Sequence, residues 1–203
     1  MAKWDGGHFE GAILHVTTRG NGGKTVFEDD ADVEIFMRGL EKSKHKFGFD
    51  LFAYCLMPNH LHLLLRVLQN PVWKVMHSVL MRYAKAFNRR RGVRGHLFED
   101  NYYPVLCERD EQFMEMVRYI HLNPVRAGLA GMPGDWRWSS WAALAEGVPD
   151  PLIDEAFVLG IFGTETERAR AELRRFVLSG MARPREEERI YAPGLRAPWM
   201  GTA

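Results

Sequence analysis

The chain has 203 residues, of which 46% are hydrophobic and 26% are charged. This size and balance are typical of one globular domain with an appendage, and they exclude disordered, collagen-like and repeat classes. No apolar run approaches the ~20 residues that span a bilayer, and the first residues lack the apolar run of a signal peptide. We therefore expect a cytoplasmic protein in which the two cysteines, Cys55 and Cys107, are free thiols.

Positive charge is concentrated in one segment, although the formal net charge is only +1. The segment from 74 to 94 has no acidic residue and contains seven basic ones: Lys74, Arg82, Lys85, Arg89, Arg90, Arg91 and Arg94. The rest of the chain holds 20 basic and 26 acidic residues. Such a segment is either a solvated helix face or a contact surface for a polyanion, and it is the best candidate for contacts with a nucleic-acid backbone.

The first half of the chain predicts strands and one helix. Residues 12–18 are apolar or β-branched and end at a glycine-rich loop, which indicates a strand. Apolar residues recur at helical spacing over about 31–46 after an acidic start. The apolar runs 49–57 and 60–67 are separated only by Pro58-Asn59, which favours a turn, so we expect an antiparallel hairpin.

The second half adds a helix, a strand and another helix. An apolar stripe over 72–87 follows Pro71, a residue that helices favour at their start. A strand is expected over 102–108, and then a helix capped by Asp110 and stopped by Pro124. This order predicts an α+β fold, a ferredoxin-like antiparallel sheet covered by helices.

The composition changes beyond the last of these elements. We interpret 1–130 as the functional core and 131–180 as a helical C-terminal extension, with helical patterns over about 152–162 and 165–179. The remaining residues, 181–203, contain three prolines among mixed charges and are expected to form a flexible tail.

Two histidines lie on the second strand of the predicted hairpin. His60 and His62 are two residues apart, so their imidazoles share one face of a strand and can converge on one ion. Two structural histidines are the alternative. Burial of two titratable rings on an apolar hairpin costs free energy unless they are bound, which favours a metal site. The single histidines at 15, 77, 96 and 121 are taken as packing or surface residues.

Tyr119 and Asn123 are one helical turn apart and lie off the apolar stripe of their helix. Taken singly, they are consistent with a boundary aromatic and a helix-ending residue. Combined with His60 and His62, they suggest that an amide oxygen completes a coordination sphere while a phenol faces a phosphate held by the metal. This chemistry is transesterification to a tyrosyl phosphodiester, which keeps the energy of the broken linkage and suits breakage and rejoining of DNA.

Several motifs in this order resemble the IS200-like tyrosine transposases, in particular the REP-associated tyrosine transposases. The resemblance covers about residues 10–145 and rests on LHVTTRGN at 14–21, AYCLMPNHLHLL at 53–64, FNRR at 87–90, RYIHLNPVRAG at 118–128 and WSS at 138–140. It implies a single-stranded DNA endonuclease of the HUH type, with Tyr119 as the nucleophile that becomes linked to the 5′ phosphate. It also implies His60, His62 and Asn123 as ligands of Mg or Mn, imperfect DNA hairpins as substrate, and a possible homodimer.

One departure from the family pattern concerns DNA affinity. Relatives usually carry a basic stretch after the Gly-His-x-Phe motif, whereas this chain has Glu99 and Asp100. Two other functions stay open on the sequence: a catalytically silent hairpin DNA-binding protein, and a phosphohydrolase that uses His60 and His62 with water as nucleophile.

Overall fold

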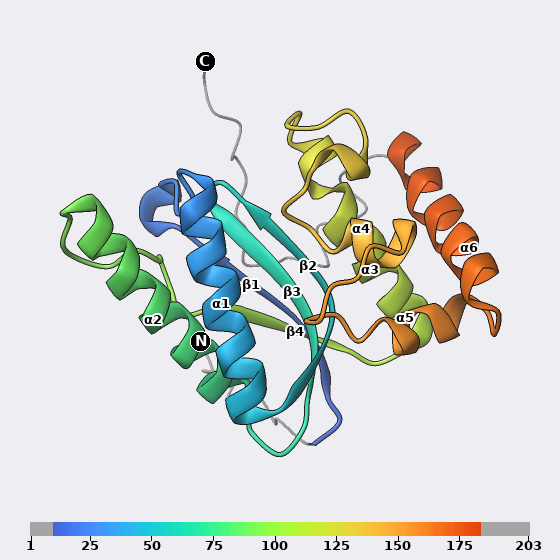
Figure 1. Cartoon of the computed structure of the whole chain (residues 1–203), viewed down its shortest axis with the longest axis horizontal. Coiled ribbons are helices and arrows are strands. Elements are labelled where there is room, and N and C mark those ends of the chain that lie inside the picture. The colour runs from blue at the N-terminus through green and yellow to red at the C-terminus, as the bar shows by residue number, and fades with distance from the viewer. Residues whose placement is uncertain (1–9, 184–203) are drawn as a thin grey trace.

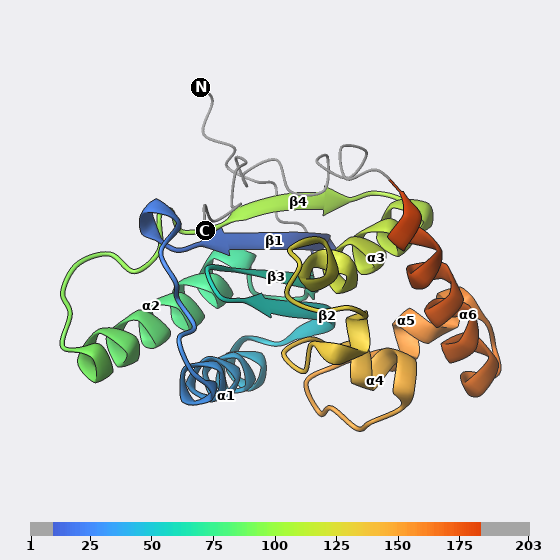
Figure 2. The ribbon, with the colours of Figure 1, turned by 90° about the horizontal axis from the view of Figure 1, so that it is seen from above.

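The computed structural model describes residues 10–183, and a four-stranded antiparallel sheet lies at its centre (Figure 2). The strands are β1 (Ile13–Arg19), β2 (Phe49–Met57), β3 (His60–Val67) and β4 (Tyr103–Cys107). Their order across the sheet is β2-β3-β1-β4, and each pair of neighbours is antiparallel. All four predicted strands are present, and the predicted β2–β3 hairpin turns at Pro58-Asn59.

Helices cover both faces of the sheet (Figures 1 and 2). They are α1 (Asp30–Phe47), α2 (Val72–Arg91), α3 (Asp110–Arg126), α4 (Trp141–Glu146), α5 (Glu155–Phe162) and α6 (Thr166–Ser179), with short 3-10 turns at Asn21–Gly23, Pro133–Asp135 and Gly180–Ala182. Helices α1 and α2 pack on one face, and α3 to α6 lie on the other. The order β1-α1-β2-β3-α2-β4 with this sheet topology is the ferredoxin-like pattern, so the predicted fold is confirmed.

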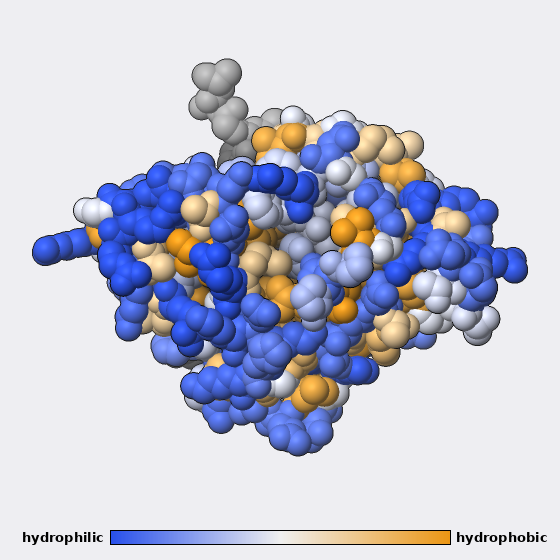
Figure 3. Space-filling view, in the orientation of Figure 1, coloured by the Kyte–Doolittle hydropathy of each residue, from blue (hydrophilic) through white to orange (hydrophobic). Residues whose placement is uncertain are grey.

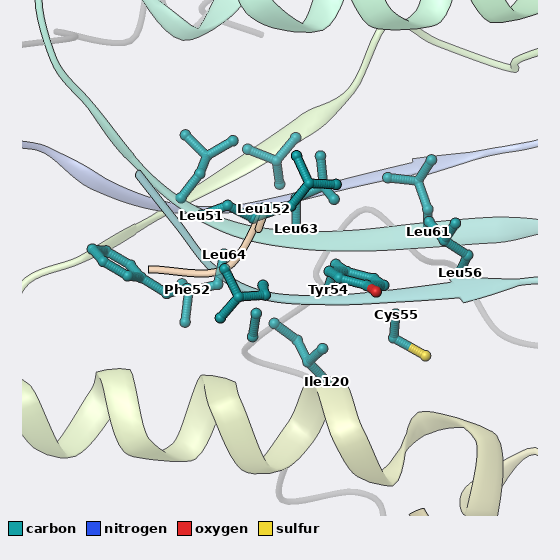
Figure 4. Close-up of a cluster of buried hydrophobic side chains, with 14 of the residues drawn as sticks. Leu51, Phe52, Tyr54, Cys55, Leu56, Leu61, Leu63, Leu64, Ile120 and Leu152 are labelled. Atoms are coloured by element: carbon teal, nitrogen blue, oxygen red, sulfur yellow. The ribbon is translucent and has the colours of Figure 1, made fainter. Parts of the chain in front are cut away.

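Alternation along β3 divides its side chains between the two helical layers. Leu61 and Leu63 lie on the opposite side of the sheet from Ile120 of α3, whereas Leu64 lies on the same side (Figure 4). Because successive side chains of a strand point to opposite faces, His60 and His62 share the α3 side with Leu64. Both layers exclude water, since every residue of β3 except Arg66 is buried.

Helix α3 differs from its prediction at both ends. Arg109 is the N-cap and Asp110 is already in the first turn, so Asp110 favours the positive helix end without capping it. Pro124 does not stop the helix, which continues to Arg126. A proline lacks one backbone donor, but the amide of Ala127 bonds to the carbonyl of Asn123 at 2.9 Å and completes the last turn.

The segment after residue 130 packs against the edge strand β2. Trp136 Nε1 donates to the carbonyl of Leu56 at 3.0 Å, and the hydroxyl of Tyr54 donates to Asp150 at 2.9 Å. Helix α4 was not predicted, because its six residues are too few for a clear periodicity. The division into 1–130 and 131–180 stays a prediction, and 184–203 of the predicted tail lie outside the described residues.

No helix within residues 10–183 is both long enough and apolar enough to cross a membrane.

Candidate active site

The candidate site is built on the pairing of β1 with β3. In this register Thr17 stands opposite His62, and His15 stands opposite Leu64. Side chains of directly paired residues share a face, so His15 lies on the same face as His60 and His62. All three imidazoles are buried, with 0–2% of their surface exposed. The sheet therefore places three buried histidines under α3.

His60 is held by the residue that precedes it. The amide of Asn59 donates through Nδ2 to the carbonyl of Gly23 at 3.3 Å, which leaves Oδ1 facing Nδ1 of His60 at 2.7 Å. An amide oxygen only accepts, so Nδ1 of His60 carries the proton. In the neutral ring Nε2 then has a lone pair that can bind a cation, and Asn59 fixes the tautomer that a metal ligand needs.

His62 lies at the centre of the cluster and contacts a ring on each side. Its ring centroid is 5.0 Å from that of His60, with the planes perpendicular, and 5.2 Å from that of His15, with the planes nearly parallel. Nδ1 of His62 is 3.0 Å from Nε2 of His15. His15 therefore belongs to the site. Its place in the site was not predicted from the sequence, because β1–β3 pairing cannot be read from local periodicity.

Tyr119 of α3 stands edge-on against these imidazoles. Its ring centroid is 5.4 Å from that of His62 and 5.8 Å from that of His15, with interplanar angles of 88° and 71°. Only 9% of the residue is exposed. The structure thus places the tyrosine on the histidine side of the sheet, beside His62, one of the two histidines with which its spacing grouped it, and beside His15, which was not in that group.

Asn123 lies one turn further along α3 and is 2% exposed. Its Nδ2 donates to the carbonyl of Tyr119 at 3.0 Å, so Oδ1 is the atom left for another partner. The side chain also interacts with His62, an effect that by itself raises the pKa of that ring. The four residues predicted from sequence are therefore neighbours in the fold.

The pKa of His62 is nevertheless lowered well below its usual value. Burial is the largest cause, and repulsion from His60 and then His15 adds to it. His62 is consequently neutral at pH 7, the state in which imidazole binds metals.

We tested whether these residues fit the divalent cation that the resemblance implies. Nε2 of His62 is buried, and no described residue meets it with hydrogen-bond geometry. Imidazole nitrogens and an amide oxygen that share one buried face are donors that bind divalent cations, so the residues fit a metal. No group of three or more His, Cys, Asp or Glu side chains that could hold a metal occurs in residues 10–183. The candidate set is two imidazoles and an amide.

The carboxylate of Glu115, one turn before Tyr119, is engaged in ion pairs and is not part of the candidate ligand set. Its carboxylate accepts from Arg118 at 2.7 Å and from Arg183 at 3.3 Å. The guanidinium of Arg118 also donates to the carbonyl of Phe176, which ties α3 to α6. The ion pair between Arg118 and Glu115 therefore has a structural role.

The basic segment on α2 divides into two groups. Arg90 and Arg91 form ion pairs with acids at the start of α1: Arg91 with Asp32 at 2.6 Å, with Asp29 at 2.7 Å and with Glu28 at 3.1 Å, and Arg90 with Asp29 at 3.2 Å and with Asp32. Hydrogen bonding from Arg90 lowers the pKa of Asp29 to about 2. Much of the positive charge of Arg90 and Arg91 is therefore neutralised by carboxylates of the protein itself.

The other five basic residues are exposed and make no ion pair with any residue in 10–183: Lys74, Arg82, Lys85, Arg89 and Arg94. Hydrophilic residues cover most of the surface seen over α1 and α2 (Figure 3). Five of the seven predicted DNA-contacting residues are thus available to a polyanion, and the other two, Arg90 and Arg91, are already paired with acidic side chains of the protein.

Known proteins share sequence and fold with this chain. Residues 9–123, more than half of the chain, match the family model described as "Transposase IS200 like". A Haemophilus influenzae protein described as a REP-associated tyrosine transposase is 22% identical over 123 residues, which are 54% of this chain and 68% of that protein.

A solved structure of a REP-associated tyrosine transposase bound to a REP hairpin also resembles this chain. The two superpose with a TM-score of 0.60 at 18% identity, over 74% of this chain and 89% of the other. Because the sequence identity is this low, the structural similarity is evidence for the fold alone. Because the family model covers β1 to α3 as far as Asn123, the chain belongs to the IS200-like transposase family.

Proposed function

We propose that this protein is a metal-dependent transposase that cleaves and rejoins single-stranded DNA hairpins through a phosphotyrosine bond. The observation that carries the proposal is the edge-on packing of Tyr119 against His62 and His15, next to His60 and Asn123. A hairpin substrate is supported by the solved relative, which is bound to a REP hairpin.

The nucleophile is the phenolic oxygen of Tyr119. It attacks the scissile phosphorus, a bond forms between this oxygen and the 5′ phosphate, and the bond to the 3′ oxygen breaks. The phenol loses its proton, and the departing 3′ oxygen gains one as a hydroxyl. A later attack by a 3′ hydroxyl reverses the step, so strands are joined without ATP.

The other site residues bind and orient. His60, His62 and Asn123 would hold Mg or Mn, which supplies positive charge that polarises the scissile phosphate. His15 positions His62 through the 3.0 Å contact between their nitrogens, and Asn59 positions His60. A cytoplasmic location and a homodimer stay predictions.

An adduct assay tests this function. A labelled single-stranded hairpin from the DNA flanking the gene is incubated with protein and Mn or Mg, then denatured. We expect a covalent adduct that EDTA and Tyr119→Phe both abolish. Tyr54→Phe is the matched control, because Tyr54 stands opposite Leu63 and its side chain lies on the other sheet face.

Two outcomes would reject the proposal. If the protein binds the hairpin without cleaving it, and neither EDTA nor Tyr119→Phe changes this binding, the protein is a catalytically silent DNA-binding protein. Turnover that survives Tyr119→Phe and leaves no adduct would assign a hydrolase with a water nucleophile.

A further inference from the structure

A cavity of about 360 Å³ lies between α2 and the segment 92–102. Helix α2 contributes Trp73, His77, Lys85 and Asn88 to its lining, and the segment contributes Asn101 and Tyr102. The candidate active site does not use any of these side chains. The cavity is therefore separate from the imidazole cluster under α3.

Hydrogen bonds fix the outer wall of the cavity to the core. Asn88 Nδ2 donates to the carbonyl of Gly95 at 3.0 Å, and the amide of Asn21 donates to the carbonyl of Leu97 at 2.9 Å. The amide of Glu99 donates to the carbonyl of Arg19 at 2.9 Å, and Arg19 pairs with His60 across β1 and β3. The wall is thus attached at the same sheet end as the candidate metal ligands.

The lining combines aromatic surface with hydrogen-bond donors and positive charge. Trp73 is 53% exposed and Met81 is 45% exposed, so apolar surface faces solvent at the cavity. No carboxylate lines it, and the exposed Lys85 makes no ion pair within residues 10–183. An apolar peptide would leave Lys85, Asn101 and the side-chain oxygen of Asn88 unused, whereas an unpaired nucleotide offers a flat base, polar edges and a phosphate.

We infer that this cavity binds an unpaired nucleotide of single-stranded DNA, with its base against Trp73 or Tyr102 and its phosphate at Lys85. The inference rests on the proposed function and adds a binding subsite away from the scissile bond. Stacking on an aromatic ring tolerates any base, while Asn88 and Asn101 can favour particular base edges.

The first test measures binding without chemistry. Anisotropy of a labelled ten-nucleotide oligothymidine is followed in EDTA with Tyr119→Phe as the parent protein. We expect Trp73→Ala to weaken binding about tenfold and Trp73→Phe to restore most of it, because a ring still stacks. Lys85→Gln should reduce the slope of log affinity against log salt by about 0.7, and Lys42→Gln, an exposed lysine on α1, should not.

The second test locates the base directly. The same oligonucleotide carrying 5-iodouracil is photocrosslinked, and the attached peptide is identified by mass spectrometry. We expect crosslinks at Trp73 or Tyr102. Crosslinks only elsewhere, or equal affinity for Trp73→Ala and its parent, would overturn the inference.

A third outcome would give the cavity another occupant. Self-association that Trp73→Ala removes, with oligonucleotide affinity unchanged, would assign the surface to a second copy of the chain and overturn the inference. None of these results depends on adduct formation, so this inference and the proposed function can fail separately.

Discussion

The two faces of the sheet use the same strands for different purposes. On the face toward α1 and α2, β3 presents Leu61, Leu63 and Leu65, all 0% exposed. On the face toward α3, the same strand presents His60 and His62, which are equally buried but polar. Burial of leucine stabilises the fold, whereas burial of an imidazole without full hydrogen bonding costs stability. The face toward α3 also holds the buried Leu64, so the two faces differ in polarity and not in burial, and we expect the apolar face to matter chiefly for stability and the polar face for the candidate site.

The largest effect is expected from His62→Ala. This ring contacts His60, His15 and Tyr119, so its removal takes away one proposed ligand and the centre of the cluster. We expect loss of metal binding by calorimetric titration with Mn and loss of the DNA adduct, while the protein stays folded. Metal affinity equal to that of the wild type would show that the polar face has no role in metal binding.

The adjacent substitution Leu63→Ala tests the apolar face. Truncation of a fully buried leucine typically lowers the free energy of unfolding by about 2–5 kcal/mol. We expect this loss in denaturant unfolding, with adduct yield per folded molecule unchanged. If Leu63→Ala instead removed the adduct at full stability, the division of labour between the faces would be wrong.

A smaller effect is expected for His15→Phe, which keeps a ring beside His62 but removes Nε2. Loss of a group that orients a metal ligand typically weakens metal affinity about 10- to 100-fold. We expect this loss with little change in unfolding, and His45→Phe, on the opposite helical layer, should match the wild type. Unchanged affinity for His15→Phe would mean that the 3.0 Å contact with His62 only packs the core.

The fold was largely predictable because its signals are local. The turn at Pro58-Asn59, the alternation on β3 and the stripe on α2 each report one element, and the order of elements limits the topology. The end of α3 was not predictable from Pro124 alone. Near a C-terminus the missing donor disrupts few bonds, so the helix runs on to Arg126.

The site was predictable only in part, since His60, His62, Tyr119 and Asn123 stand in motifs with regular spacing. His15 was missed because its relation to His62 arises from pairing between strands 47 residues apart. The burial of α3 on two sides was also missed. A single stripe predicts one buried face, but α6 covers another, so that even Arg118 is 1% exposed.

The substitution Asp29→Asn tests whether the layer formed by α1 and α2 contributes to DNA binding. The carboxylate of Asp29 caps α1 by accepting from the amide of Asp32 at 2.9 Å, and it pairs with Arg90 and Arg91. Asparagine caps a helix almost as well, so the substitution mainly removes one of the carboxylates that neutralise the two arginines, which stay paired with Asp32. We expect a modest gain in affinity for single-stranded DNA and a steeper salt dependence.

The same variant has a defined pH signature. The pKa of Asp29 is lowered from 3.8 to about 2, so its pairing stabilises the fold fully above pH 3.8 and is lost as the pH falls toward 2. Acid unfolding of the wild type should include this loss, and Asp29→Asn should lack it. If DNA affinity and its salt dependence did not change in Asp29→Asn, Arg90 and Arg91 would serve only to join α2 to α1, and this layer would contact DNA solely through its other basic residues.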